Sequence, residues 1–177
     1  MRAALRECHQ EEHFERVNDC HSALNESFVS VVRPQNQQEL VEALGRAAAE
    51  GRVVSICGNR HAMGGQQFCH SEVMLDMRNI CRVLSLDEER GLICVEGGAT
   101  WPQLHDALRT RGSRWTFRQK QTGADTLSIG GALSANVHGR GLQLCPFIQD
   151  VESFVLQTAT KRLHCSRTEN AHLFSLA

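Results

Sequence analysis

Hydrophobic and polar positions follow two different periods along the first half of the chain. Residues 35–51 carry apolar side chains at 40, 41, 44, 47 and 48, the spacing of one helix face, and Gly51 suits the helix C-terminus. Short apolar runs bounded by glycine, proline or charged turns predict strands. These runs lie at 27–34, 52–58, 73–77, 81–87 and 91–98. The strand–helix–strand order predicts a small, partly parallel sheet.

The pattern changes along the second half of the chain. Residues 101–112 predict another helix, with Pro102 in its first turn and Gly112 just after its end. From residue 113 onward we expect glycine-rich loops, one short helix and a hairpin at 151–165. The polar residues 1–27 predict an amphipathic helix and a connector. We place a boundary between two lobes near residue 97.

Composition and charge narrow the classes of function. The chain has 177 residues, of which 41% are hydrophobic and 22% charged, as in a globular protein with one domain or two small lobes. A net charge of −1 and scattered basic residues argue against a nucleic-acid-binding surface. The sequence shows neither an export signal nor an apolar run of about 20 residues. We therefore expect a cytoplasmic protein without a transmembrane segment.

The eight cysteines are expected to be free thiols in a reducing compartment. None belongs to a C-x-x-C pair. Four Cys–His neighbours occur, at 8–9, 20–21, 69–70 and 164–165, but their spacings match no zinc finger or knuckle. We therefore expect no metal site and interpret the cysteines as small hydrophobic residues.

The first candidate for chemistry is the turn GNRHAMGGQ, residues 58–66. Glycine permits positive φ and close backbone approach, so successive N–H groups can converge on an anion. The spacing matches neither a Walker A loop nor G-x-G-x-x-G, which excludes a P-loop nucleotidase. A plain strand-to-loop turn stays an alternative.

The second candidate is QTGADTLSIGGALSANVHGRG, residues 121–141. Gly130 and Gly131 begin a run of small residues that would let a helix N-terminus lie against a planar or phosphorylated ligand. Another glycine-rich turn follows at 138–141. Close helix packing also uses glycine and alanine, and explains the same residues equally well.

Taken together, these loops and their neighbours resemble the FAD-binding domain of the vanillyl-alcohol oxidase superfamily, also called PCMH-type or FAD-linked oxidases. The similar stretches, in chain order, are VVRPQNQQELVEAL, VVSICGNRHAMGGQQ, LICVEGGATWPQLHDALRTRG, TLSIGGALSANVHGRG, DVESFVLQTA and SRTENAHLF. The resemblance implies an α+β fold, the two-lobed FAD-binding type-2 (PCMH-like) domain. A small, partly parallel sheet lobe would span 28–97. An incomplete antiparallel-sheet lobe with helices would span 98–177, after an N-terminal helical extension at 1–27.

The resemblance also implies FAD as the cofactor and assigns residues to it. The first loop would contribute Gly58, Asn59, Arg60, His61, Ala62, Gly64, Gly65 and Gln66. The second loop and the next strand would contribute Thr126, Ser128, Ile129, Gly130, Gly131, Ser134, Asn136, His138, Gly139 and Val151. Val155 is expected in the same strand as Val151, and Gly97 and Gly98 in a turn between the lobes.

His61 stands where many family members carry a histidine bonded covalently to the 8α-methyl carbon of the flavin. Asn59 and Ala62 depart from the glycine and serine usual beside it, so a non-covalent contact and a plain turn histidine stay alternatives. No cysteine lies between 121 and 138, so a second covalent bond is not expected. His138 is implied close to the isoalloxazine, with a purely structural hydrogen bond as an equal alternative.

The implied activity is FAD-dependent oxidation of an alcohol, sugar or lactone, with hydride transfer to flavin N5. Family members continue past the place of Ala177 into a further strand and a substrate domain, so the chain is interpreted as C-terminally truncated and its catalytic residues are unassigned. A non-catalytic flavin-binding fragment is the alternative, and a metal-binding protein a disfavoured third. Thr160 and Lys161 replace the Asp-Gly usual in relatives, which predicts a longer or weaker hairpin turn.

Overall fold

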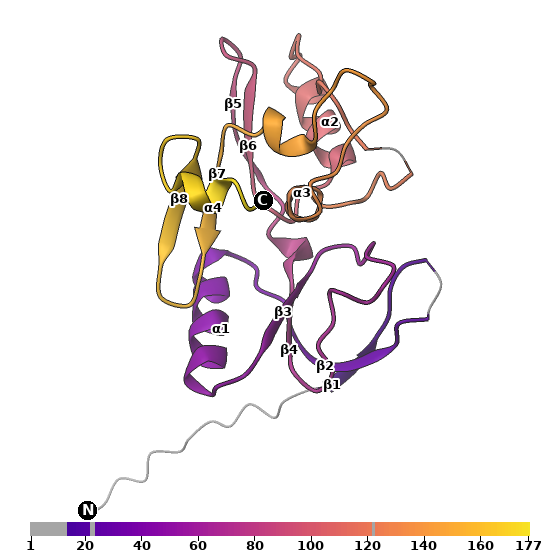
Figure 1. Cartoon of the computed structure of the whole chain (residues 1–177), viewed down its shortest axis with the longest axis vertical. Helices are drawn as coiled ribbons and strands as arrows, with labels where there is room; N and C mark the ends of the chain where they lie inside the picture. Colours follow the sequence, from indigo (N-terminus) through magenta and orange to yellow (C-terminus); the bar gives the residue numbers. More distant parts are fainter. Residues whose placement is uncertain (1–13, 22–23, 122) are drawn as a thin grey trace, which may run out of the picture.

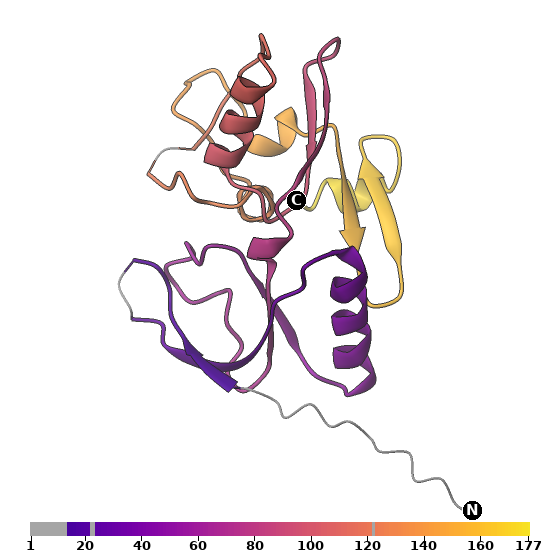
Figure 2. The ribbon, with the colours of Figure 1, turned by 180° about the vertical axis from the view of Figure 1, so that it is seen from behind.

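The computed structural model describes residues 14–21, 24–121 and 123–177. Strands β1–β4 and helix α1 form the lower half in Figure 1, while β5, β6, α2 and α3 form the upper half. The β7–β8 hairpin lies at the side, as the view from behind in Figure 2 also shows. Sheets and helices are mixed, and the predicted α+β class is confirmed.

A four-stranded sheet organises the lower half, in the order β1-β2-β4-β3. Its strands are β1 (Phe14–Val17), β2 (Ser27–Val32), β3 (Val54–Cys57) and β4 (Val73–Asp76). β4 is parallel to both of its neighbours and β1 is antiparallel to β2, which confirms the partly parallel sheet.

The helix predicted within residues 1–27 is wrong for the part that the structure describes. Phe14 stacks on Phe28 of β2, with ring centroids 5.4 Å apart, and Val17 is buried in the core. Cross-strand packing of this kind stabilises an added strand more than local helix propensity does. Residues 1–13 of that prediction lie outside the described residues.

Helix α1 (Gln37–Ala49) covers one face of this sheet. Asn36 caps its N-terminus by accepting a hydrogen bond from the Glu39 amide, and Gly51 follows its end with φ of +68°. The interface is made by alternate residues of β4 and by small residues of the helix. These buried residues are Ala43, Ala47, Val73 and Leu75.

The chain between β3 and β4, residues 58–72, lies over the opposite face. Met74 points to this side because it alternates with its neighbours in β4, and Phe68 packs against it from the connecting loop. Cys57, at the end of β3, is 2% exposed. Burial raises the pKa of the Cys57 thiol to about 11. The first glycine-rich loop therefore starts from a firmly packed strand end.

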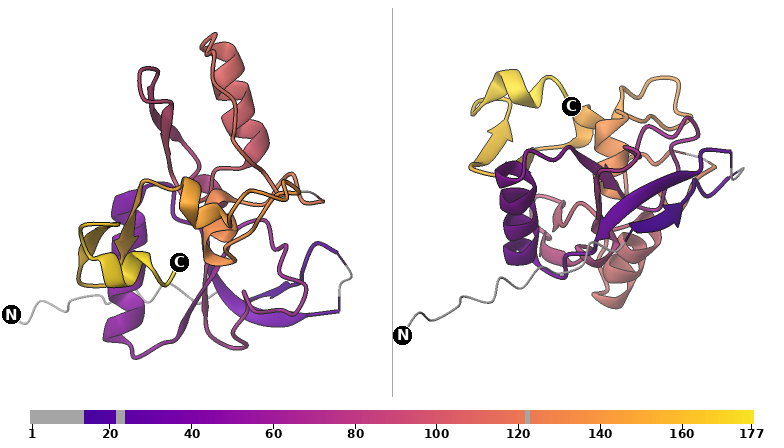
Figure 3. Two further views of the ribbon diagram at one scale, coloured as in Figure 1. Left: turned by 45° about the horizontal axis from the view of Figure 1, so that its top comes forward. Right: turned by 90° about the horizontal axis from the view of Figure 1, so that it is seen from below.

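The upper half begins with a hairpin of β5 (Val83–Asp87) and β6 (Leu92–Val95), which form a separate two-stranded sheet. Helix α2 (Trp101–Thr110) follows, and Figure 3 shows that the hairpin and this helix project to the same side. Trp101 packs edge-on against Phe117 and Phe147, at centroid distances of 5.3 and 5.6 Å. The sequence assigned residues 83–95 to the first lobe, whereas their hairpin lies in the half that contains α2. The exact lobe boundary stays a prediction.

The remaining elements are short: η1 (Met77–Asn79), α3 (Ile129–Ser134), η2 (Phe147–Asp150), β7 (Ser153–Gln157), β8 (Arg162–Ser166) and α4 (Ala171–Phe174). The β7–β8 turn spans residues 158–161 and is closed by a 2.8 Å hydrogen bond from the Thr158 amide to the Lys161 carbonyl. The longer or weaker turn expected from the missing Asp-Gly stays a prediction.

Two broader expectations concern cysteines and membranes. The seven cysteines among the described residues are all free thiols, as predicted. Within the same part of the chain, no helix combines the length and apolarity needed to cross a membrane.

Candidate functional site

The two glycine-rich loops meet, although they are more than 60 residues apart in sequence. The Asn59 side-chain amide donates a 2.6 Å hydrogen bond to the carbonyl of Thr126. His61 Nε2 lies 2.8 Å from the Thr126 hydroxyl oxygen. One residue of the second loop is therefore held through both its backbone and its side chain by the first loop.

Glycine at position 58 makes this approach possible. A Cβ atom there would lie 2.5 Å from Oγ of Ser128, closer than real Cβ contacts come. Ser128 itself caps α3, because its hydroxyl oxygen accepts a hydrogen bond from the Gly131 amide. The end of β3 and the start of α3 thus touch directly.

A second close approach, which sequence reasoning missed, joins α3 to the glycine pair at 97–98. The amide of Gly130 donates to the Gly97 carbonyl at 2.7 Å, and a Cβ on residue 130 would come within 2.9 Å of that oxygen. A Cβ on Gly98 would collide with the Met77 carbonyl. Two of the chain's three Gly-Gly pairs, at 97–98 and 130–131, were the available signal.

These contacts change what the α3 N-terminus can offer to a ligand. The amides of Ile129, Gly130 and Gly131 already donate to Ala99, Gly97 and Ser128. The N–H groups of a helix start bind an anion only where no protein acceptor uses them. Contacts from these three residues to a dinucleotide would therefore use other atoms.

The first loop, in contrast, has open donors. Within the described residues, the consecutive backbone amides of 59–62 donate no hydrogen bond. Arg60 has φ of +60°, and a left-handed residue in a turn can direct successive N–H groups toward one point. Gln66 stabilises the far end of the loop, where its Oε1 accepts from the Gly64 amide at 3.0 Å. This donor set fits a diphosphate.

The β1–β2 connection supports the first loop from the other side. The Cys20 amide donates to the Arg60 carbonyl at 3.1 Å, and Asn25 Nδ2 donates to the Met63 carbonyl at 2.6 Å. Sequence reasoning missed this contribution because it assigned residues 1–27 to a helical extension. No motif in that segment gives a signal for it.

His61 is held between three polar groups. Besides Thr126 on Nε2, its Nδ1 lies 3.3 Å from Cys20 Sγ and 3.3 Å from His21 Nε2. Partial burial, and then the positive charge that His21 can carry, lower the pKa of His61 below its usual value. A lowered pKa favours the neutral imidazole, which keeps a nitrogen lone pair for bonding.

A hollow of about 490 Å³ lies along the second loop. Its lining residues are Gln121, Ala135, Asn136, Val137, His138, Gly139 and Arg140. Gln121 is buried, and its Oε1 has no hydrogen-bond partner among the described residues. An unpartnered buried acceptor beside a hollow suits a polar ligand that brings its own donor, such as a ribityl hydroxyl.

Several predicted site residues also have structural contacts. His138 Nδ1 donates to the Gly139 carbonyl at 2.9 Å, so a structural bond exists beside its place in the hollow. Asn136 Oδ1 accepts from the Ile148 amide at 3.2 Å. Val151 is not in a strand, contrary to the prediction: it ends η2, two residues before β7. Val155 does lie in β7 and is exposed.

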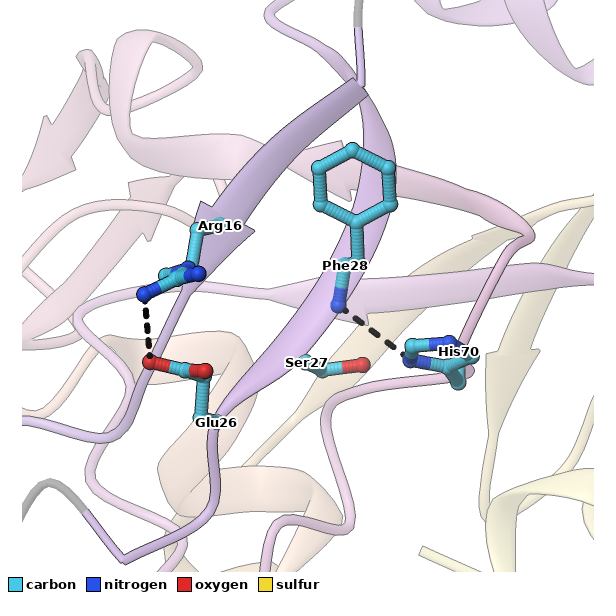
Figure 4. Close-up of a pocket in the computed structure, with 5 residues that line it drawn as sticks. All are labelled: Arg16, Glu26, Ser27, Phe28 and His70. Atoms are coloured by element: carbon cyan, nitrogen blue, oxygen red, sulfur yellow. Dashed lines mark hydrogen bonds and ion pairs between the residues drawn. The ribbon is translucent and has the colours of Figure 1, made fainter.

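Another hollow, of about 320 Å³, lies at the edge of the sheet beside β1 and β2 (Figure 4). Arg16 and Glu26 face each other across it at 3.6 Å, and His70 Nδ1 accepts from the Phe28 amide at 3.3 Å. Its polar groups are thus paired with one another. It offers a ligand little, and the meeting point of the two loops is the stronger candidate.

Comparison with known proteins agrees with this choice. The family described as FAD binding domain matches residues 29–160, which include both loops. The chain belongs to this family. The recognised resemblance and the expectation of FAD as cofactor are therefore confirmed for this FAD-binding domain.

Its relatives are oxidases and dehydrogenases by name. The domain is 33% identical over 130 residues to L-gulono-1,4-lactone dehydrogenase of Mycobacterium tuberculosis, covering 73% of this chain and 29% of that protein. It is 27% identical over 147 residues to L-gulonolactone oxidase of Bos taurus, covering 82% and 32%. The chain thus spans about a third of the length of these relatives.

Solved structures show the same fold. Carbohydrate oxidase from Microdochium nivale superposes with a TM-score of 0.69 at 20% identity, over 83% of this chain and 31% of that one. Alkyldihydroxyacetonephosphate synthase gives a TM-score of 0.70 at 21% identity, over 80% and 27%. The two-lobed PCMH-like FAD-binding fold predicted from the sequence is confirmed.

Proposed function

We propose that this chain is the flavin-binding portion of an FAD-dependent oxidoreductase that oxidises a sugar, a lactone or another alcohol. The observation that carries the proposal is the double contact of Thr126 with Asn59 and His61, which holds the two loops of the FAD-binding domain against each other. FAD supplies a hydride acceptor at flavin N5. The relatives' names favour a sugar-derived lactone as the substrate.

The chain's own residues divide the work of binding. The open amides of 59–62 would hold the diphosphate, and the hollow at 135–140 would receive the ribityl and ring portion. Gly58 and Gly130 act indirectly, by letting β3, α3 and the 97–98 turn approach closely. The predicted contacts of the other residues in both loops remain part of this proposal.

His61 is proposed as the covalent attachment point of the flavin. Its neutral imidazole is fixed by Thr126 on one nitrogen, so the ring has a defined orientation toward a bound partner. A bond through either nitrogen would displace one contact that His61 now makes, to Thr126 or to the Cys20–His21 pair. Reversible contact with the cofactor is the alternative.

Flavin titration of the purified chain tests the proposal. We expect one FAD to bind per chain, with quenching of flavin fluorescence. Anaerobic L-gulono-1,4-lactone should then bleach the oxidised flavin band if the chain acts alone. Bound flavin that no sugar or lactone reduces would favour the non-catalytic fragment. A folded chain that binds no FAD would contradict the proposal itself.

Two finer expectations also stay proposals. The first lobe of 28–97 and the second of 98–177 are tested by limited proteolysis, which should cut between them if they are separate units. A cytoplasmic location is tested by fractionation. One matched relative, L-galactono-1,4-lactone dehydrogenase 1 of Oryza sativa, is mitochondrial by name.

A further inference from the structure

Three potential metal ligands from two distant segments converge beside the first loop. Cys20 and His21 lie in the β1–β2 connection, and His61 lies 40 residues later in the first glycine-rich loop. The thiol sulfur and the nearest ring nitrogens all lie within 4.8 Å of one another. Among the described residues, this is the one such grouping.

The separations match those of a tetrahedral zinc site. Zn–S bonds of about 2.3 Å and Zn–N bonds of about 2.0–2.1 Å place ligand atoms roughly 3.3–3.6 Å apart at tetrahedral angles. His61 Nδ1 lies 3.3 Å from Cys20 Sγ and 3.3 Å from His21 Nε2. The third pair of ligand atoms, in Cys20 and His21, lies within 4.8 Å, and both residues are exposed.

Thr126, which lies outside the cluster, fixes the ring of His61, the ligand that contacts both Cys20 and His21. The other ring nitrogen of His61 lies 2.8 Å from the Thr126 hydroxyl, so a proton on Nε2 leaves the Nδ1 lone pair facing Cys20 and His21. Metal-binding histidines characteristically donate their second N–H to such a partner, which sets the tautomer and the ring orientation. The second loop thus supports a ligand in the first.

Short polar side chains also hold the Cys20–His21 segment. Asp19, which is 7% exposed, accepts from the His21 amide at 2.8 Å and from Asn25 Nδ2 at 2.8 Å. Asn18 Oδ1 accepts from the Asn25 amide at 3.0 Å. These bonds close the loop before any metal binds, which lowers the entropy cost of binding.

We propose that Cys20, His21 and His61 bind one zinc ion, with water in an open fourth position. One thiolate and two neutral imidazoles are a ligand set that zinc favours, and Cys20 releases its thiol proton on binding. The site joins the β1–β2 connection to the first glycine-rich loop in the flavin-free chain. With Nδ1 on zinc and Nε2 on Thr126, His61 cannot carry the covalent flavin proposed above at the same time. Spacing alone gave no sign of it, because the third ligand is supplied by the fold.

The experiment is a metal titration of the flavin-free, reduced full chain, so its outcome is independent of FAD. We expect one equivalent of Zn²⁺ to bind. Co²⁺, used as a spectroscopic probe, should give visible tetrahedral bands and a thiolate-to-cobalt charge-transfer band. Cys20→Ser should abolish the charge-transfer band, and His21→Ala should weaken Zn²⁺ binding at least about tenfold.

Thr126→Val provides a test that leaves all three ligands in place. Loss of the second hydrogen bond of His61 should weaken zinc binding by about 10–100-fold. Cys145→Ser and His105→Ala are matched controls, because both residues are exposed and lie outside the cluster. Both should bind Zn²⁺ like the unmodified chain, and circular dichroism checks that every variant is folded.

Three results would overturn the proposal. The first is a folded chain that takes up no Zn²⁺ or Co²⁺. The second is unchanged affinity in both Cys20→Ser and His21→Ala. The third is an equal loss in the control variants, which would indicate nonspecific binding to surface thiols and imidazoles.

Discussion

The side-chain amide of Asn59 donates to the backbone carbonyl of Thr126, and this 2.6 Å bond joins loops 67 residues apart. Family members usually carry glycine at the place of Asn59, which could not form the bond. The residue that departs from the pattern is thus the one that ties the loops together. Asn59 departs from the family pattern in sequence, but in the fold its side chain forms a specific contact between the two loops.

Asn59→Ala tests that contact. The free energy of unfolding should fall by about 1 kcal/mol, the usual net value of such a hydrogen bond, and FAD should bind more weakly. Thermal unfolding and flavin titration measure the two effects. Asn79→Ala is the control, since Asn79 is exposed and its side chain forms no hydrogen bond with the described residues. Equal behaviour of the two variants would argue against a role for the loop contact.

His61→Ala should remove acid-stable flavin while leaving reversible binding. After acid precipitation, flavin should stay with the unmodified protein and appear in the supernatant of the variant. His105→Ala, on the exposed face of α2, should behave like the unmodified chain. Acid-stable flavin that persists without the His61 imidazole would rule out attachment at this residue.

Gly130 and Gly131 occupy successive positions of α3 but should differ in how well they tolerate substitution by alanine. Alanine gains about 1 kcal/mol over glycine in a helix interior. At 130 the added Cβ meets the rigid Gly97 carbonyl at 2.9 Å, whereas at 131 it meets side-chain atoms that can move. Gly130→Ala should therefore be less stable than Gly131→Ala by about 1–3 kcal/mol. Chemical denaturation measures the difference, and equal stabilities would refute the close packing.

The sequence predicted the regular elements well because their signals are local. The helix at 37–49 has an apolar stripe, a cap and a terminal glycine, and each is visible in neighbouring letters. Strand β1 and the Cys20–His21–His61 cluster depend on contacts between segments far apart. Gly97 and Gly98 were read as a turn, although their backbone is where α3 and η1 pack. Such roles belong to the tertiary structure and leave no local pattern.

Asp76 predicts a pH dependence of stability. Burial alone would raise its pKa, but hydrogen bonds and charge from Arg78, with the charge of Arg33, outweigh burial and hold the pKa below its usual value. A depressed folded-state pKa contributes stability that is present above the unfolded pKa, about 3.9, and is lost as the pH falls through the folded value.

Asp76→Asn should therefore lower the free energy of unfolding at pH 7 by about 1.5–3 kcal/mol, the range for hydrogen bonds to charged groups. The difference in the free energy of unfolding between the variant and the unmodified chain should become smaller below about pH 4. Asp106→Asn is the control: its pair with Arg109 is exposed, so the loss should stay below about 1 kcal/mol. If this difference in the free energy of unfolding did not change with pH, the charge of Asp76 would not be the source of the stability.

The cysteines should separate into two reactivity classes. Thiolate is the reacting form, so a pKa raised from 9.0 to about 11 lowers the thiolate fraction of Cys57 about 100-fold near neutral pH. Burial behind Met74 and Val29 also blocks the reagent. Cys94 on β6 is exposed, so the reagent can reach its thiol. Alkylation followed by mass spectrometry, in the presence of a chelator, should label Cys94 in the native chain.

Cys57 should react only after unfolding, because its protection comes from the packed end of β3 that carries the first loop. Native labelling of both at the same rate would mean that this strand end opens readily, and the loop it carries could not be a preformed binding site.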